Sequence, residues 1–98
     1  MVVTKLEKAR DSINTADSGI AELFEMRMHA VEDVVAFKME NSLPVFDGAR
    51  EKEVIERNLA MIKDEKLKPY YRDMIVQLMR ISKEYQQNII DSNKSSEV

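Results

Sequence analysis

The chain has 98 residues, no cysteine and a formal net charge of −3 at pH 7. That length allows one domain with a modest core, and the lack of cysteine excludes disulfide bonds and thiolate metal sites. Only 2 Gly and 2 Pro, beside 34% charged residues, favour an all-α fold with few turns. A negative chain without a basic, aromatic-lined face also argues against nucleic acid as a partner.

Nothing in the sequence predicts contact with a membrane. No segment approaches the roughly 20 apolar residues that span a bilayer. The stretch from Met1 to Lys8 lacks the charged flank and apolar run of a secretory signal. We therefore expect a soluble, cytoplasmic protein.

The first predicted helix is unusually long for so short a chain. Thr4 followed by Glu7 forms a capping box, so the helix should begin at about Lys5 and end near Asn41, shortly before Pro44. Such a helix of about 37 residues would be about 55 Å long, whereas a compact monomer of this size has a radius of gyration of only about 12–13 Å. The rest of the chain cannot cover it, which predicts an intertwined homodimer.

Cations interrupt the apolar stripe of this helix. The residues that recur at steps of four and three are Leu6, Arg10, Ile13, Asp17, Ile20, Phe24, Arg27, Val31, Val34 and Lys38. Three of these residues are basic and one is acidic. A buried charge is costly unless it is paired, so a bound anion could complete the stripe. Alternatively, the side chains extend to water or pair with acids elsewhere in the fold.

A second helix is predicted from an N-cap at Asp47 to about Lys63. Arg50 and Glu51 occupy its first turn, beside a buried face of Val54, Ile55, Leu59 and Ile62. An acidic residue there favours the helix dipole, which is the simpler explanation of Glu51.

After the charged connection 64–68, a third helix is expected with Pro69 at its first position. Its apolar face comprises Met74, Ile75, Leu78, Met79, Ser82, Gln86, Ile89 and Ile90. Ser82 and Gln86 lie near the centre of that face and need hydrogen-bond partners, either internal or from a ligand. We expect one domain over residues 1–90 and a polar, frayed tail over residues 91–98.

Several kinds of active site are not supported by the sequence. His29, the single histidine, is predicted to lie on the surface, so no metal site and no nucleophile–base pair can be built around it. A glycine-rich phosphate loop is also missing. We expect no metal and no cofactor.

An ordered set of motifs nevertheless resembles a known family. The set comprises Arg10, Arg27-Met28-His29-Ala30-Val31, Lys38, Asn41-Ser42-Leu43-Pro44-Val45-Phe46-Asp47, Arg50-Glu51 and Ile81-Ser82-Lys83-Glu84-Tyr85-Gln86. From about Leu6 to Gln87 the chain resembles the all-helical class of chorismate mutases. The resemblance implies three-helix protomers intertwined in a homodimer with two equivalent sites. It also implies cofactor-free rearrangement of chorismate to prephenate, on the route to phenylalanine and tyrosine.

The resemblance assigns four residues to the carboxylates of the substrate. Arg27 would bind one carboxylate from its own protomer, and Arg10 would reach the other across the dimer. Arg50 would contribute to carboxylate binding, and Ser82 would support it. Bidentate guanidinium groups suit this task.

The remaining assignments concern the ether and hydroxyl groups of the substrate. Lys38 and Gln86 would grip the ether oxygen of the breaking bond, where negative charge grows in the transition state. Glu51 and the backbone at Asp47 would hold the ring hydroxyl. A pericyclic step needs no acid or base, only a compact conformer and this charge stabilisation.

Alternatives remain at the levels of register and function. An ungapped placement puts Lys83 and Gln87 at the last two site positions, whereas the buried face favours Ser82 and Gln86. The same scaffold supports isochorismate-pyruvate lyase activity. A non-catalytic helical dimerisation or adaptor module would explain the stripe but would leave its cations, Gln86 and Arg50-Glu51 as coincidences.

Overall fold

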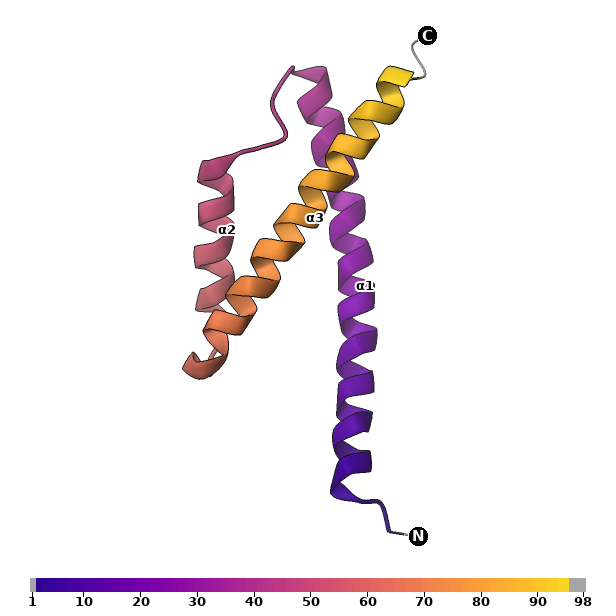
Figure 1. Cartoon of the computed structure of the whole chain (residues 1–98), viewed down its shortest axis with the longest axis vertical. Helices are drawn as coiled ribbons and strands as arrows, with labels where there is room; N and C mark the ends of the chain where they lie inside the picture. The colour runs from indigo at the N-terminus through magenta and orange to yellow at the C-terminus, as the bar shows by residue number, and fades with distance from the viewer. Residues whose placement is uncertain (1, 96–98) are drawn as a thin grey trace. The chain divides into compact units, whose positions relative to one another are not determined.

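A computed structural model of the protein describes residues 2–95 (Figure 1). Over that range the chain forms α1 (Lys5–Glu40), α2 (Gly48–Ala60), the 3₁₀ turn η1 (Glu65–Leu67) and α3 (Lys68–Ser95), with no strand. The expected all-α class is therefore confirmed. The chain divides into two compact units, Met1–Ala30 and Val31–Val98. None of the helices within residues 2–95 is both long and apolar enough to cross a bilayer.

The first unit contains the N-terminal part of α1. The predicted capping box is present in part, since the hydroxyl of Thr4 accepts a hydrogen bond from the Glu7 amide at 3.1 Å. The apolar side chains of this segment are open to solvent, with Leu6, Ile13 and Ile20 each 57% exposed. The unit therefore buries little of its own apolar stripe.

A tight C-terminal cap ends α1 in the second unit. Ser42 has a positive φ of 53°, the left-handed conformation that usually follows a helix. The amide of Leu43 donates to the carbonyl of Lys38 at 2.8 Å, and the amide of Ser42 donates to that of Met39 at 3.4 Å. These two bonds form a Schellman motif, which turns the chain one residue before the expected end of the helix.

The buried line at this end of α1 differs from the prediction at one position. Val31 and Val35 are buried, Val35 to 1% exposure, whereas Val34 remains 45% exposed. Within the single chain Val35 thus takes the buried position, and Val34 is open like Leu6, Ile13 and Ile20 on the predicted stripe. A straight helix has 3.6 residues per turn, so a step of four from Val31 stays closer to its face than a step of three.

Both ends of α2 have local causes. The Asp47 carboxylate accepts from the Arg50 amide at 3.1 Å, which confirms the predicted N-cap. At the other end the amides of Met61 and Ile62 donate three residues back, to the carbonyls of Asn58 and Leu59. This tightening ends α2 at Ala60, three residues before the expected position.

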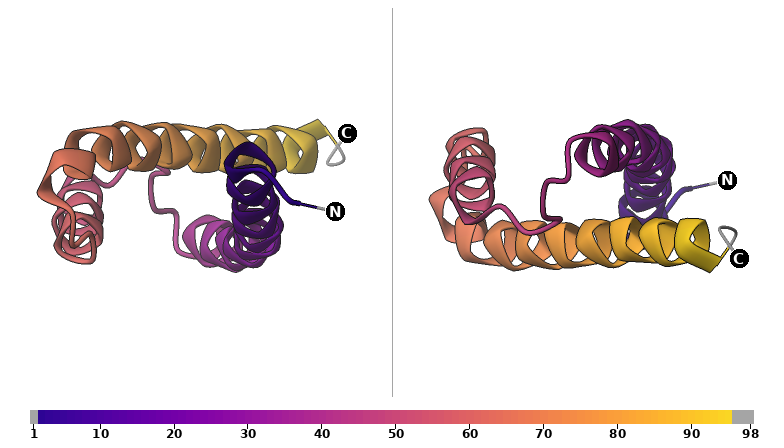
Figure 2. Two further views of the ribbon diagram at one scale, coloured as in Figure 1. Left: turned by 90° about the horizontal axis from the view of Figure 1, so that it is seen from below. Right: turned by 90° about the horizontal axis from the view of Figure 1, so that it is seen from above.

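The core of the second unit lies between α2 and α3, and both views of Figure 2 show α2 next to the N-terminal part of α3. Val54, Ile75 and Met79 form its centre, and Ile55, Tyr71 and Leu78 pack around them. These residues confirm the predicted apolar faces, except that Met74 is exposed.

The third helix is longer than expected. It begins at Lys68, so Pro69 is its second residue, and it continues to Ser95, five residues past Ile90. The helix thus includes residues 91–95 of the predicted polar tail, whose fraying stays a prediction, and the rest of that tail lies outside the described residues. Gln87 supports the extension, because its side-chain amide donates to the Asp91 carboxylate one turn later at 3.0 Å. The single domain over residues 1–90 stays a prediction.

Candidate active site

Two polar side chains are buried on the inner face of α3. Ser82 is 5% exposed and Gln86 is 6% exposed, which confirms their predicted position on that face. The Ser82 hydroxyl donates to the Leu78 carbonyl at 2.9 Å. The Gln86 Oε1 atom is buried and has no hydrogen-bond partner within residues 2–95. A buried amide oxygen in this state is destabilising, so it indicates a place where a ligand can contribute a contact.

The neighbouring pair on α3 behaves differently. Gln87 is exposed and bonds to Asp91 within its own helix. The Lys83 ammonium lies 3.0 Å from Glu51 Oε2 and 5.3 Å from the centre of the Phe46 ring. Burial therefore favours Ser82 and Gln86 over Lys83 and Gln87 as the inward-facing pair.

Glu51 in the first turn of α2 is paired across helices. Its carboxylate is only partly exposed and makes the ion pair with Lys83 on α3. In the sequence, the helix dipole was the simpler explanation of Glu51, and nothing linked this residue to Lys83. No sequence signal joins residues this far apart, because the crossing of α2 and α3 brings them together.

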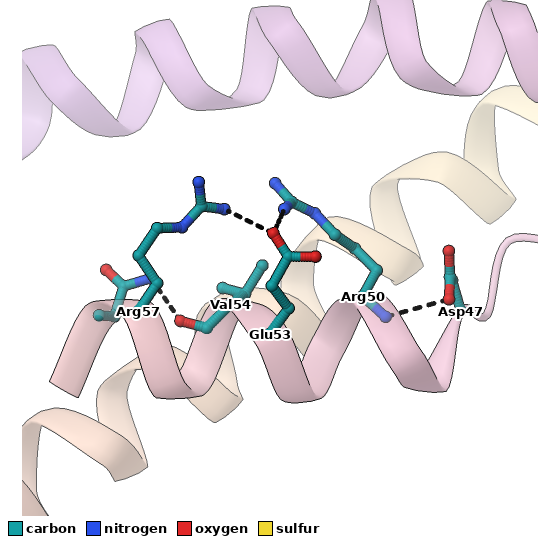
Figure 3. A network of polar contacts seen from close by, with 6 residues as sticks. Asp47, Arg50, Glu53, Val54 and Arg57 are labelled. Atoms are coloured by element: carbon teal, nitrogen blue, oxygen red, sulfur yellow. Dashed lines mark hydrogen bonds and ion pairs between the residues drawn. The ribbon is translucent and has the colours of Figure 1, made fainter. Parts of the chain in front are cut away.

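Arg50 is engaged within its own helix. Its guanidinium Nη1 lies 3.0 Å from Glu53 Oε1, and Arg57 approaches the same oxygen at 3.7 Å (Figure 3). All three side chains are exposed, so these ion pairs add little stability. Arg50 is therefore held along α2 near the Asp47 cap while keeping further N–H groups for a ligand.

Lys38 lies near the C-terminus of α1 and is half-buried. Its ammonium donates to the main-chain carbonyl of Val45 at 2.8 Å. A carbonyl can orient an ammonium group without neutralising its charge. Lys38 consequently offers a positioned cation beside the loop that leads to Asp47.

Tyr85, the neighbour of Gln86, links α3 to the C-terminal part of α1. Its hydroxyl donates to Glu32 Oε2 at 2.5 Å. This hydrogen bond raises the pKa of Tyr85 above its usual value, with smaller contributions from burial and from the negative charge of Glu32. The contact fixes the rotation of α3 immediately beside Gln86.

The other two predicted cations belong to the first unit. Arg10 is exposed and Arg27 is half-buried. The second unit contains Lys38, Asp47, Arg50, Glu51, Ser82 and Gln86. Within the part of the chain that the structure describes, no three His, Cys, Asp or Glu side chains are grouped to hold a metal ion.

A comparison with protein families identifies the chain. The family model described as chorismate mutase type II matches residues 9–87. No curated protein and no solved structure matches the chain. The matched segment runs through α1, α2 and most of α3, and it includes every candidate residue from Arg10 to Gln86. The chain belongs to the chorismate mutase type II family, a family of isomerases.

Proposed function

We propose that the protein catalyses the intramolecular Claisen rearrangement of chorismate to prephenate, on the route to phenylalanine and tyrosine. The observation that carries this proposal is the pair of buried polar residues, Ser82 and Gln86, inside the segment that matches the family. Of the two, Gln86 has a buried amide oxygen without a hydrogen-bond partner within the described residues, and such a group favours a ligand that can contribute a contact.

The ether oxygen is the centre of the proposed mechanism. As its bond to the ring breaks, negative charge accumulates on that oxygen, and positioned donors stabilise it. Lys38 supplies an ammonium whose partner, the Val45 carbonyl, is uncharged. Gln86 supplies an amide, and rotation of its terminal group exchanges the places of oxygen and NH₂, so a donor can face the ether.

The two substrate carboxylates are assigned to the arginines. Arg27 binds one carboxylate from its own protomer, while Arg10 reaches the other from the partner protomer. Arg50 adds a contact from α2, since Glu53 engages only one of its nitrogens. Ser82 supports a carboxylate from α3. These contacts hold the substrate in the compact conformer that reacts.

The ring hydroxyl is assigned to the start of α2. Glu51 accepts a hydrogen bond from this hydroxyl through a carboxylate oxygen, and the backbone at Asp47 provides a second contact. The N-cap fixes that backbone, since the Asp47 side chain bonds to the Arg50 amide.

Dimerisation completes the proposal. Leu6, Ile13 and Ile20 leave an apolar stripe uncovered along α1. A second copy that packs its own α1 along this stripe would bury it and would bring Arg10 to the neighbouring site. In this arrangement α1 runs as one long helix through an intertwined homodimer.

An absorbance assay of chorismate loss, together with identification of the product, tests the function. We expect prephenate from chorismate and no turnover of isochorismate. Release of pyruvate from isochorismate would instead identify the lyase activity. A folded dimer that turns over neither compound would be a non-catalytic interaction module.

A further inference from the structure

Lys83 touches both elements that flank the proposed ring-hydroxyl contacts. Its ammonium lies 3.0 Å from Glu51 Oε2 in the first turn of α2 and 5.3 Å from the centre of the Phe46 ring. Phe46 immediately precedes Asp47, whose backbone provides the other proposed contact. One side chain of α3 therefore contacts the residues on either side of the loop-to-helix junction.

The Phe46 ring is held from two directions although much of its surface is open. Its Cζ atom would lie 3.2 Å from a Cβ atom added to Gly48, so the ring already rests against the first residue of α2. Lys83 covers the ring as a cation over an aromatic face, an attractive arrangement. Phe46 and Gly48 bracket Asp47, and fixing the ring limits the movement of the backbone between them.

Glu51 gains a defined orientation from the same contact. A glutamate on a partly exposed helix face can adopt several rotamers, and an ion pair across to another helix selects one of them. Lys83 engages Oε2 and leaves Oε1 to accept a hydrogen bond.

We propose that Lys83 is a positioning residue for the ring-hydroxyl subsite, acting through Glu51 and through the Phe46–Asp47 backbone. This inference rests on the proposed mutase function and adds a residue to it. Lys83 makes no contact with the reacting bond. Because a hydroxyl contact is similar in substrate and transition state, its weakening should raise KM and leave kcat nearly unchanged.

The test compares Lys83→Met with Lys66→Met, which removes the same charge from an exposed ion pair with Asp64. Each variant is assayed with chorismate and with chorismate whose ring hydroxyl is replaced by hydrogen. We expect Lys83→Met to raise KM for chorismate about three- to fivefold, the effect of losing a partly exposed ion pair. Its KM for the deoxy substrate should equal that of the wild type. The KM values of Lys66→Met for both substrates should equal those of the wild type.

Two further variants separate positioning from general structure. Lys83→Arg keeps the charge and should restore most of the affinity for chorismate. In a Glu51→Gln background, Lys83→Met should raise KM for chorismate less than it does in the wild type, because only the contact with Phe46 remains to be lost. If Lys83→Met fails to fold by circular dichroism, Lys83→Gln takes its place in the same comparison.

The outcomes distinguish this inference from the function on which it rests. If Lys83→Met raises KM equally for chorismate and for the deoxy substrate, Lys83 is a purely structural residue. The same conclusion follows if Lys83→Met raises KM for chorismate as much in the Glu51→Gln background as in the wild type. An unchanged KM in Lys83→Met would remove it from the subsite. A wild-type protein that does not convert chorismate would overturn the mutase function itself, and this inference with it.

Discussion

The Lys38 ammonium donates a hydrogen bond to the main-chain carbonyl of Val45 at 2.8 Å. The same residue accepts from the Leu43 amide through its own carbonyl, as part of the cap that ends α1. Lys38 is thus fixed by both its backbone and its side chain, and the loop folds around it. A cation held in this way needs little reorganisation when negative charge develops nearby.

Lys38→Ala should lower kcat for chorismate by about 10²–10³-fold, the usual effect of removing a positioned donor to developing charge. Steady-state kinetics measure the change, with Lys52→Ala on the exposed side of α2 as the control. If Lys38→Ala raises only KM, Lys38 binds the ground state and transition state equally well.

Gln86→Glu should become most active in acid. A neutral amide donates a hydrogen bond at any ordinary pH, whereas a carboxyl group donates only when it is protonated. The measurement is kcat/KM against pH for the wild type and the variant. No such change is expected in the wild type from this residue.

Gln87→Glu is the matched control for Gln86→Glu, because Gln87 is exposed one position along α3. If the acid-dependent profile appears in Gln87→Glu alone, the site faces one residue further round the helix. If neither variant shows it, α3 contributes no side-chain donor to the reaction.

Sedimentation at micromolar concentration should give about twice the chain mass of 11.4 kDa. Ile20→Asp should reduce that mass and the activity together, because it places a charge on the uncovered stripe of α1. A folded monomer with full activity would contradict the intertwined dimer.

Arg10→Ala and Arg27→Ala should each be nearly inactive alone and should recover activity when refolded together. In a mixed dimer with the proposed sharing of sites, one of the two sites receives both intact arginines. The measurement is chorismate turnover by heterodimer purified with two different tags. A heterodimer without recovered activity would place both arginines in the site of one protomer.

Local signals predicted much of the second unit. Asp47 caps α2 because a short acidic side chain can reach the free amides of the first turn, and this interaction needs no other part of the chain. The burial of Ser82 and Gln86 followed from helical periodicity.

Features that depend on packing were harder to predict. Hydrogen bonds to carbonyls three residues earlier end α2 sooner than expected. The hydrogen bond between the Gln87 and Asp91 side chains supports α3 beyond its apolar residues. The Lys83–Glu51 pair depends on how α2 and α3 cross, which periodicity within either helix does not specify. Sequence reasoning therefore predicted the faces of the helices better than their ends and their mutual contacts.

The buried amide oxygen of Gln86, which has no hydrogen-bond partner among the residues that the structure describes, implies a conflict between heat resistance and turnover. An apolar residue of similar size would remove an unsatisfied buried group, and unfolding would then cost about 1–3 kcal/mol more. Gln86→Leu should therefore raise the melting temperature in a thermal scan while abolishing chorismate conversion. Laboratory selection for thermostability alone would tend to discard this glutamine, so retaining it requires a simultaneous selection for activity.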